Sequence, residues 1–290
     1  MKDLPGLKQN EPMSGYTTFH VGGLADYFIT CTDEEHLLQA VEWAGNKKIP
    51  VFILGEGSNI LVSDRGIEGI VIKLGGKFEE LRWQKSGIIA GCAVSLPELS
   101  RQCSGRGLGG LEFARGIPGS LGGALIMNAG AYGHFIEEVV RSVRLFYDNE
   151  IIEIEKDRIN FGYRESGFPD SSILLFADLE LKREKPDVLE KIAEEYIKKR
   201  RARQPLGAWS AGCIFRNPPG EKAWELIEKS SAHSLKVGDA EVSDVHKNFI
   251  INRRNASAAQ IWELICKVKD RVRLNTGIEL ELEIKRVGRW

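Results

Sequence analysis

The sequence has no long apolar run, no cluster of cysteines and almost no net charge. It contains no stretch of some ~18 uncharged apolar residues, so no transmembrane helix is predicted. The N-terminal segment MKDLPGLKQNEPMSG lacks the apolar core of a signal peptide. A formal net charge of -1 excludes a global basic field of the kind that holds nucleic acid. Such a balance still permits a local basic patch for an anionic small molecule.

The five cysteines are too scattered to form a disulfide framework or a metal site. Their number is odd, and no CxxC pair or Cys/His metal spacing occurs among Cys31, Cys92, Cys103, Cys213 and Cys266. Free thiols buried in a reducing compartment account for at least four of them. We therefore expect a cytoplasmic protein without a bound metal ion.

The sequence does have the composition of a folded globular protein. Its 290 residues are 42% hydrophobic and 28% charged, and this length suffices for one large domain or two to three small ones. Helical stripes and short strands follow one another without a repeat, which is an α+β pattern. The composition changes around 204–207, the best candidate for a linker.

Local signals predict the individual elements. Capping-box pairs predict three helix starts: Thr32 with Glu35, Ser95 with Glu98, and Ser257 with Gln260. Two strands joined by the turn Asp148-Asn149 predict a hairpin over 140–154. Further helices are predicted over 186–203 and 221–231, and further strands over 51–54, 67–74, 88–93, 173–181, 213–215 and 248–252. Alternating apolar and charged residues predict a last strand over 278–285.

Two glycine-rich loops dominate the sequence, GEGSN at 55–59 and GIPGSLGG at 116–123. Because glycine tolerates positive φ, successive backbone N–H groups in such loops can converge on an anion. Pro118 suits the first turn of a short helix whose free N–H groups add to that site. Neither loop matches the P-loop or the dinucleotide fingerprint. Tight turns and helix packing remain the alternative for each loop alone, but two such loops in one chain favour a diphosphate-containing cofactor.

Seven sequence blocks resemble those of the UDP-N-acetylenolpyruvoylglucosamine reductase (MurB) family. In chain order they are TTFHVGGLADYF (17–28), LGEGSNILVSD (54–64), LEFARGIPGSLGGALIMNAGAYG (111–133), FGYRES (161–166), SAGCIFRNP (210–218), VSDVHKNFIIN (242–252) and ELELEIKRVG (279–288). They occur in the family's order and span nearly the whole chain, which makes the resemblance specific.

The resemblance implies an FAD-binding region of the vanillyl-alcohol-oxidase (PCMH) type, built from two subdomains, and a C-terminal α+β substrate-binding domain. The corresponding domains are 1–75, 76–203 and 204–290. The resemblance also implies the reaction. NADPH reduces non-covalently bound FAD, which passes a hydride to UDP-N-acetylglucosamine enolpyruvate and yields UDP-N-acetylmuramate for peptidoglycan synthesis. By position, the FAD contacts are Gly55, Glu56, Gly57, Ser58, Asn59, Ile60, Gly116, Ile117, Pro118, Gly119, Ser120, Gly122 and Gly123.

The resemblance assigns three side chains to the chemistry. Hydride transfer to the enolpyruvyl group needs donors at its carboxylate and a proton source for the adjacent carbon. Arg164 matches the catalytic arginine, whose planar fork suits a carboxylate. Glu283 matches the catalytic glutamate, which can donate a hydrogen bond once a nearby carboxylate raises its proton affinity. Cys213 stands where the family most often has a serine proton donor. Its thiol is acidic enough for that role, although it is open to oxidation.

Ordinary structural roles stay open for all three residues. Arg164 can pair with Glu165 at the surface. Glu283 shares a predicted strand face with two other glutamates, and such a face is usually solvated. Cys213 can be a small buried residue that opens a strand.

Substrate recognition is predicted at four residues: Tyr132, Tyr163, Arg203 and Asn217. The basic run over 198–203 is explained as well by a solvated helix end. The chain lacks the tyrosine-bearing insertion of the longer family class and resembles the shorter class.

Two other functions stay open. One is an oxidase of the same fold that tethers FAD to a histidine, for which His20 and His134 are candidates by their proximity to the motifs. The other is a nucleotide-binding sensor that has lost the chemistry, against which the joint presence of Arg164, Cys213 and Glu283 argues. The oligomeric state is not predicted.

Overall fold

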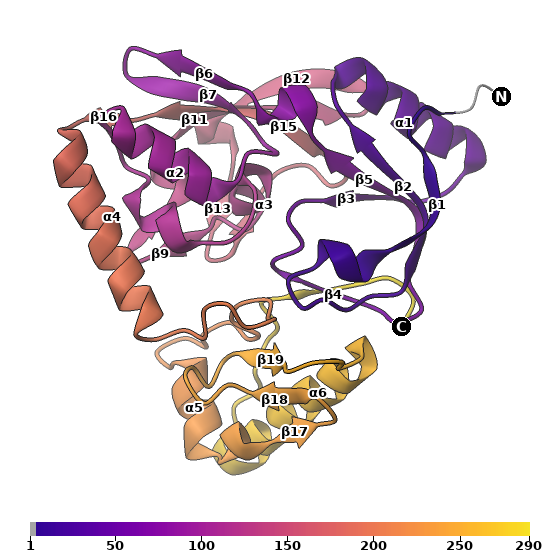
Figure 1. Ribbon diagram of the computed structural model, residues 1–290, viewed down its shortest axis with the longest axis vertical. Helices are drawn as coiled ribbons and strands as arrows, with labels where there is room; N and C mark the ends of the chain where they lie inside the picture. The colour runs from indigo at the N-terminus through magenta and orange to yellow at the C-terminus, as the bar shows by residue number, and fades with distance from the viewer. Residues whose placement is uncertain (1–3) are drawn as a thin grey trace. The chain divides into compact units, whose positions relative to one another are not determined.

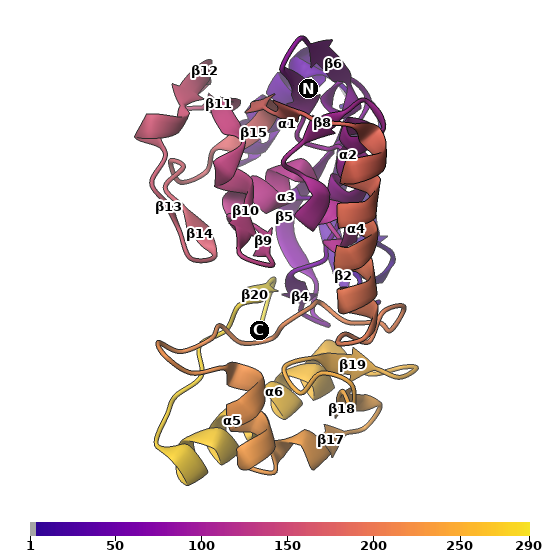
Figure 2. The same cartoon turned by 90° about the vertical axis from the view of Figure 1, so that its left-hand side faces the viewer.

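The computed structural model of the chain describes residues 4–290 and divides them into two compact units. Unit 1 contains the residues up to Leu7, Ile29–Glu56 and Ile72–Arg200. Unit 2 contains Lys8–Phe28, Gly57–Val71 and Arg201–Trp290. Both units mix helices and strands, as Figures 1 and 2 show. The predicted α+β class is confirmed.

A five-stranded antiparallel sheet, in the order β12-β11-β15-β7-β6, forms the centre of unit 1. Its strands are β6 (Leu81–Gln84), β7 (Gly87–Gly91), β11 (Val140–Tyr147), β12 (Glu150–Glu155) and β15 (Ile173–Glu180). Asp148 and Asn149 join β11 to β12 with φ values of 50° and 62°. Positive φ at both central residues is the conformation of the hairpin turn that matches strand twist, so the predicted hairpin is confirmed.

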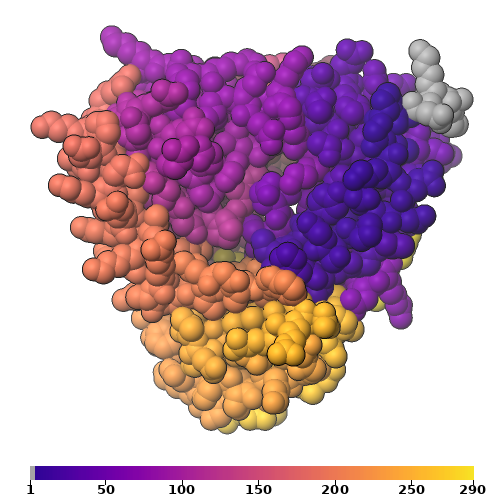
Figure 3. Space-filling view, in the orientation of Figure 1, coloured from indigo at the N-terminus to yellow at the C-terminus, as the bar shows by residue number. Residues whose placement is uncertain are grey.

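Helices and short ribbons complete unit 1. The helices are α1 (Glu34–Lys47), α2 (Leu96–Gly105), α3 (Leu121–Ile126) and α4 (Pro186–Arg201). The ribbons pair β8 (Leu108–Gly109) with β16 (Lys182–Arg183), β9 (Gly130–Ala131) with β10 (His134–Phe135), and β13 (Phe161–Gly162) with β14 (Glu165–Ser166). Only Leu189 and Ala193 of α4 are buried, and side chains of this segment stand out at the surface in the space-filling view of Figure 3.

A second sheet has the order β1-β2-β5-β3, with β1 (Lys8–Pro12), β2 (Leu24–Cys31), β5 (Ile67–Leu74) and β3 (Val51–Leu54). The predicted strands over 51–54 and 67–74 are therefore present. In β3 only Leu54 is buried.

Unit 2 has its own core around the longest helix, α6 (Ala258–Thr276). Beside it lie α5 (Ala223–Lys229) and a three-stranded sheet of β17 (Lys236–Val237), β18 (Ala240–Val242) and β19 (Ile250–Asn252). Strand β4 (Ile60–Val62) pairs in parallel with β20 (Lys285–Val287). The apolar stripe of α6 is buried throughout: Ile261, Leu264, Ile265, Val268 and Val272. Short 3-10 helices lie at Met13–Tyr16, Gly76–Glu79, Glu112–Gly116, Ile136–Glu138, Lys156–Arg158 and Ala232–Ser234.

The three predicted helix caps have different outcomes. Ser257 and Gln260 form the predicted capping box. Ser95 precedes α2, but its side chain makes no capping hydrogen bond. The prediction that Thr32 caps the helix is wrong. Asp33 is the N-cap of α1, and its side chain accepts from the N–H of His36 at 2.9 Å. Asp is as good a cap as Thr, and starting there places two glutamates in the first turn.

The predicted strand over 278–285 is wrong as a regular strand. Its segment makes one isolated bridge, Phe215 to Leu282, and the regular ladder begins only at Lys285. The predicted alternation persists in the burial, since Leu280 and Ile284 are buried. The predicted strand over 213–215 likewise makes only isolated bridges. The other predicted elements are present with ends shifted by a few residues.

Candidate active site

The first glycine loop leaves β3 and turns sharply at Gly57, whose φ is 63°. A side chain at Gly57 would lie 2.0 Å from the carbonyl oxygen of Tyr16, so no other residue fits. Within residues 4–290, no hydrogen bond uses the backbone N–H of Gly55, Glu56 or Gly57. Three consecutive N–H groups without a partner there are a suitable donor set for phosphate oxygens. The loop therefore fits the diphosphate of FAD.

The second glycine loop uses most of its N–H groups in hydrogen bonds to other parts of the protein or to itself. The N–H of Gly122 donates to the Cys92 carbonyl at 2.8 Å, and that of Gly123 to the Ser120 hydroxyl at 3.2 Å. Ser120 is the N-cap of α3, so the prediction that Pro118 opens the helix is wrong. A serine that caps its own helix satisfies one of the free N–H groups. Helix packing thus accounts for Gly122, and the FAD contacts of this loop remain predictions.

Arg164 lies at the tip of the β13–β14 hairpin of unit 1, beside Tyr163. Its φ is 61°, and its guanidinium lies 5.4 Å from the centre of the Tyr163 ring. Asn128 holds one hairpin strand by donating to the Gly162 carbonyl at 3.0 Å. Ser166 holds the other strand by donating to the Ile126 carbonyl at 2.9 Å. Because Ile126 ends α3, the helix that begins in the second glycine loop anchors the arginine hairpin.

Cys213 and Glu283 lie in unit 2 on two segments that are hydrogen-bonded to each other. The N–H of Glu283 donates to the carbonyl of Ile214, the residue after Cys213, at 2.8 Å. Cys213 is partly exposed and Glu283 is half-buried, whereas Glu279 and Glu281 are exposed. The alternative that Glu283 belongs to a solvated face is therefore not supported. The two side chains predicted to share the chemistry stand on adjoining segments.

The end of the first glycine loop is bonded to the same segment. Asn59 donates from Nδ2 to the carbonyl of Glu283 at 3.2 Å and accepts from the N–H of Lys285 at 3.0 Å. Ile60 then pairs with Lys285 in the parallel β4–β20 ladder. Asn59, predicted to contact FAD, thus also supports the main chain of Glu283.

The predicted substrate residues have structural partners of their own. The Tyr132 hydroxyl donates to the Tyr196 carbonyl at 2.9 Å, and the two rings stack 4.5 Å apart. Asn217 accepts from the N–H of Ala223, the first residue of α5, at 3.0 Å. Tyr163 and Arg203 are exposed. Tyr132 and Tyr163 lie in unit 1, and Arg203 and Asn217 lie in unit 2.

The two histidines considered as flavin attachment points are both engaged with neighbours. The His20 ring stacks on Trp209 with the ring centres 4.4 Å apart. His134 Nδ1 lies 3.0 Å from a carboxylate oxygen of Glu138.

Asn248 is a residue to which the sequence prediction gave no role. It is 3% exposed, and its amide bonds the backbone of Phe215. The sequence does contain a feature that could have indicated this role: Asn248 directly precedes the apolar run that leads into β19. An asparagine buried at such a position needs hydrogen-bond partners for its amide.

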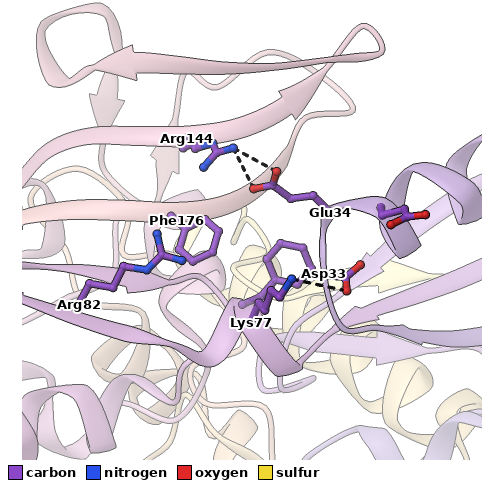
Figure 4. Close-up of a pocket in the computed structure, with 8 residues that line it drawn as sticks. Asp33, Glu34, Lys77, Arg82, Arg144 and Phe176 are labelled. Carbon is purple, nitrogen blue, oxygen red and sulfur yellow. Dashed lines mark hydrogen bonds and ion pairs between the residues drawn. The ribbon is translucent and has the colours of Figure 1, made fainter.

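A surface pocket of unit 1 has a volume of about 230 Å³ and holds none of the predicted site residues. Figure 4 shows its charged groups facing one another, with Arg144 on Glu34 at 2.9 Å and Lys77 at 3.9 Å from Asp33.

Among residues 4–290, no group of three or more His, Cys, Asp or Glu side chains is placed to hold a metal ion. None of the helices described there has the length and apolar character needed to cross a membrane.

Comparisons of the sequence with known proteins identify the family. Residues 25–154 match an FAD-binding domain, and residues 204–287 match the C-terminal domain of UDP-N-acetylenolpyruvoylglucosamine reductase. The chain is 41% identical to the UDP-N-acetylenolpyruvoylglucosamine reductase of Desulforamulus reducens, over 97% of this chain and 94% of that protein. It is 38% identical to a reductase of the same name from Symbiobacterium thermophilum, over 98% and 93%.

A solved structure extends the likeness to the fold. The crystal structure of the Thermus caldophilus enzyme superposes with a TM-score of 0.85 at 35% identity, over 95% of this chain and 97% of that chain. The chain is therefore a member of the UDP-N-acetylenolpyruvoylglucosamine reductase (MurB) family and carries that family's FAD-binding domain.

Proposed function

We propose that this chain reduces UDP-N-acetylglucosamine enolpyruvate to UDP-N-acetylmuramate at the expense of NADPH, in the synthesis of peptidoglycan precursors. A bound FAD would supply the hydride chemistry, from NADPH to the terminal carbon of the enolpyruvyl double bond. A proton from the protein completes the reduction at the adjacent carbon. NADPH and one proton are consumed, and NADP⁺ and the saturated ether are formed.

The chain's own groups prepare the substrate for this transfer. The free N–H groups of Gly55, Glu56 and Gly57 would hold the FAD diphosphate. Arg164 would bind the substrate carboxylate, where negative charge grows as the hydride arrives.

Cys213 and Glu283 would act on the carbon skeleton. The Cys213 thiol would give its proton to the carbon beside the carboxylate. A protonated Glu283 would donate a hydrogen bond that polarises the alkene. The observation that carries the proposal is the bond between the Glu283 N–H and the Ile214 carbonyl at 2.8 Å, which keeps acid and donor on adjoining segments.

The direct test is an absorbance spectrum of the purified protein, followed by NADPH oxidation with and without the enolpyruvyl substrate. A flavin spectrum and substrate-dependent oxidation are expected. Flavin that precipitates with the protein in acid would point instead to a covalent flavin oxidase. A flavoprotein that does not oxidise NADPH with this substrate would contradict the proposal.

Two further proposals concern the limits of the domains and the compartment in which the protein acts. We propose FAD-binding subdomains over 1–75 and 76–203 and a substrate domain over 204–290. We also propose that the reaction takes place in the cytoplasm, which free cysteines throughout the described residues support.

A further inference from the structure

Asn248 is a buried polar residue that the chemistry above leaves without a role. Both atoms of its side-chain amide bond one residue, Phe215. Its Oδ1 accepts from the Phe215 N–H at 3.0 Å, and its Nδ2 donates to the Phe215 carbonyl at 2.8 Å. The Asn248 side chain thus pairs with Phe215 as the peptide group of a neighbouring strand would.

The segment that carries Cys213 needs this support because it belongs to no regular ladder. It makes isolated bridges from Cys213 to Phe249 and from Phe215 to Leu282. On one side, the Ile214 N–H donates to the Asn248 carbonyl at 2.9 Å. On the other side, the Ile214 carbonyl accepts from the Glu283 N–H at 2.8 Å. Backbone and side chain of Asn248 together therefore make three of the bonds that hold the segment.

We propose that Asn248 is a positioning residue that fixes the register of Cys213 against Glu283. In an extended segment, a shift by one residue turns every side chain to the opposite face. Without the amide, the Phe215 N–H and carbonyl lose their partners, and the segment is free to shift or twist. This inference rests on the roles proposed for Cys213 and Glu283.

Asn252 is a matched control four residues further along the chain, at the end of β19. It is also 3% exposed, and its amide also makes two hydrogen bonds, to the Phe19 carbonyl at 2.9 Å and from the Ala256 N–H at 3.0 Å. Neither partner belongs to the Cys213 segment. In both cases replacement by alanine removes one buried side-chain amide that makes two hydrogen bonds. A general loss of stability from this change should therefore be similar in the two variants.

The experiment compares Asn248→Ala and Asn252→Ala below their unfolding temperatures. The measurements are the iodoacetamide alkylation rate of Cys213, read from the mass of its peptide, and the rates of flavin reduction by NADPH and reoxidation by substrate. We expect Asn248→Ala to change the alkylation rate and to slow reoxidation by roughly 10-fold to 100-fold, because small misplacements of reacting groups have effects of this size. Flavin reduction should stay near normal, and Asn252→Ala should leave all three rates near those of the wild type.

A conservative variant keeps the test decisive if Asn248→Ala does not fold. In Asn248→Asp the ionised side chain cannot donate to the Phe215 carbonyl, but the protonated acid can. Burial favours the protonated form, so the reoxidation rate relative to the wild type should recover as the pH falls. The absence of such recovery would overturn the proposal, as would equal effects in the Asn248 and Asn252 alanine variants. A changed alkylation rate with unchanged reoxidation would support the positioning role and overturn Cys213 as the proton donor.

Discussion

Glu283 donates its backbone N–H to the carbonyl of Ile214 at 2.8 Å. The two residues are far apart in the chain, and this bond sets Glu283 beside the segment that begins at Cys213. Asn59 supports the same residue through its other backbone polar group, by donating to the Glu283 carbonyl at 3.2 Å. Bonds to the main chain of Glu283 thus hold this residue, whose carboxyl group is proposed to take part in the reaction, and a change of its side chain leaves these bonds in place.

Replacement of Cys213 should separate the two half-reactions. Cys213→Ala removes the proposed proton donor, so flavin reoxidation by substrate should slow by about 10²-fold to 10⁴-fold. Flavin reduction by NADPH should stay near normal, because it needs no proton at that carbon. Stopped-flow absorbance of the flavin measures both rates. Cys213→Ser should restore most of the lost rate, and an equal loss in both half-reactions would contradict the donor role.

The Glu283 side chain should be replaceable in part by an amide. Glu283→Gln keeps a hydrogen-bond donor, whereas Glu283→Ala removes it and should slow reoxidation by roughly 10²-fold to 10³-fold, the usual effect of losing one such donor. Single-turnover reoxidation of the reduced enzyme measures the difference. If the glutamine variant is as slow as the alanine variant, Glu283 does not act as a neutral donor.

The two serines at helix starts should differ in their effect on stability. Ser257 accepts from the Gln260 N–H at 3.1 Å, so Ser257→Ala should lower the free energy of unfolding by about 0.5–2 kcal/mol. Ser95 makes no such bond, and Ser95→Ala should cost clearly less. Urea unfolding followed by circular dichroism compares them. Equal losses would show that the Ser257 capping box does not contribute.

Thiol reagents should distinguish the cysteines by burial. Burial raises the pKa of the Cys31 and Cys103 thiols to about 12 and that of Cys92 further above its ordinary range. Since only the thiolate reacts, native protein should label at most at Cys213 and Cys266, which are partly exposed. Titration with a chromogenic disulfide should give at most two fast thiols, and one in Cys213→Ser. A third fast thiol would contradict the burial of the other three.

His246 should make the protein less stable in mild acid. Burial lowers the pKa of its imidazole below the ordinary value, so the unfolded chain binds the proton more readily. Its stabilising effect is full above the ordinary histidine pKa of about 6.5 and is lost as the pH falls below that value. The Nδ1 of His246 accepts a hydrogen bond from the Asn248 N–H at 3.3 Å. Protonation of this nitrogen would remove its acceptor lone pair and break that bond.

The measurement for His246 is the free energy of unfolding in urea at pH 7.5 and at pH 5.5. His246→Asn keeps an acceptor without a titrating group, so its loss between the two pH values should be smaller than that of the wild type. An equal loss in both proteins would remove His246 as the cause.

Local physics made much of this fold predictable from the sequence. The apolar stripe of α6 repeats at helical spacing, and Ser257 with Gln260 marks its start. The turn Asp148-Asn149 combines two residues that tolerate positive φ between alternating strands. In each case the determining contacts lie within a few residues. The family blocks added the identity of Arg164, Cys213 and Glu283, which composition and periodicity alone left with ordinary structural roles.

The sequence by itself therefore determined the fold class, the main helices and strands, and the family. Tertiary structure decided which distant segments meet: the Ile214 carbonyl with the Glu283 N–H, Asn59 with the Glu283 carbonyl, and the Asn248 amide with Phe215. It also decided that the segments around Cys213 and Glu283 form isolated bridges rather than strands. The physical reason is that hydrogen bonds between remote residues depend on how the core packs. The spacing of residues along the sequence does not predict them.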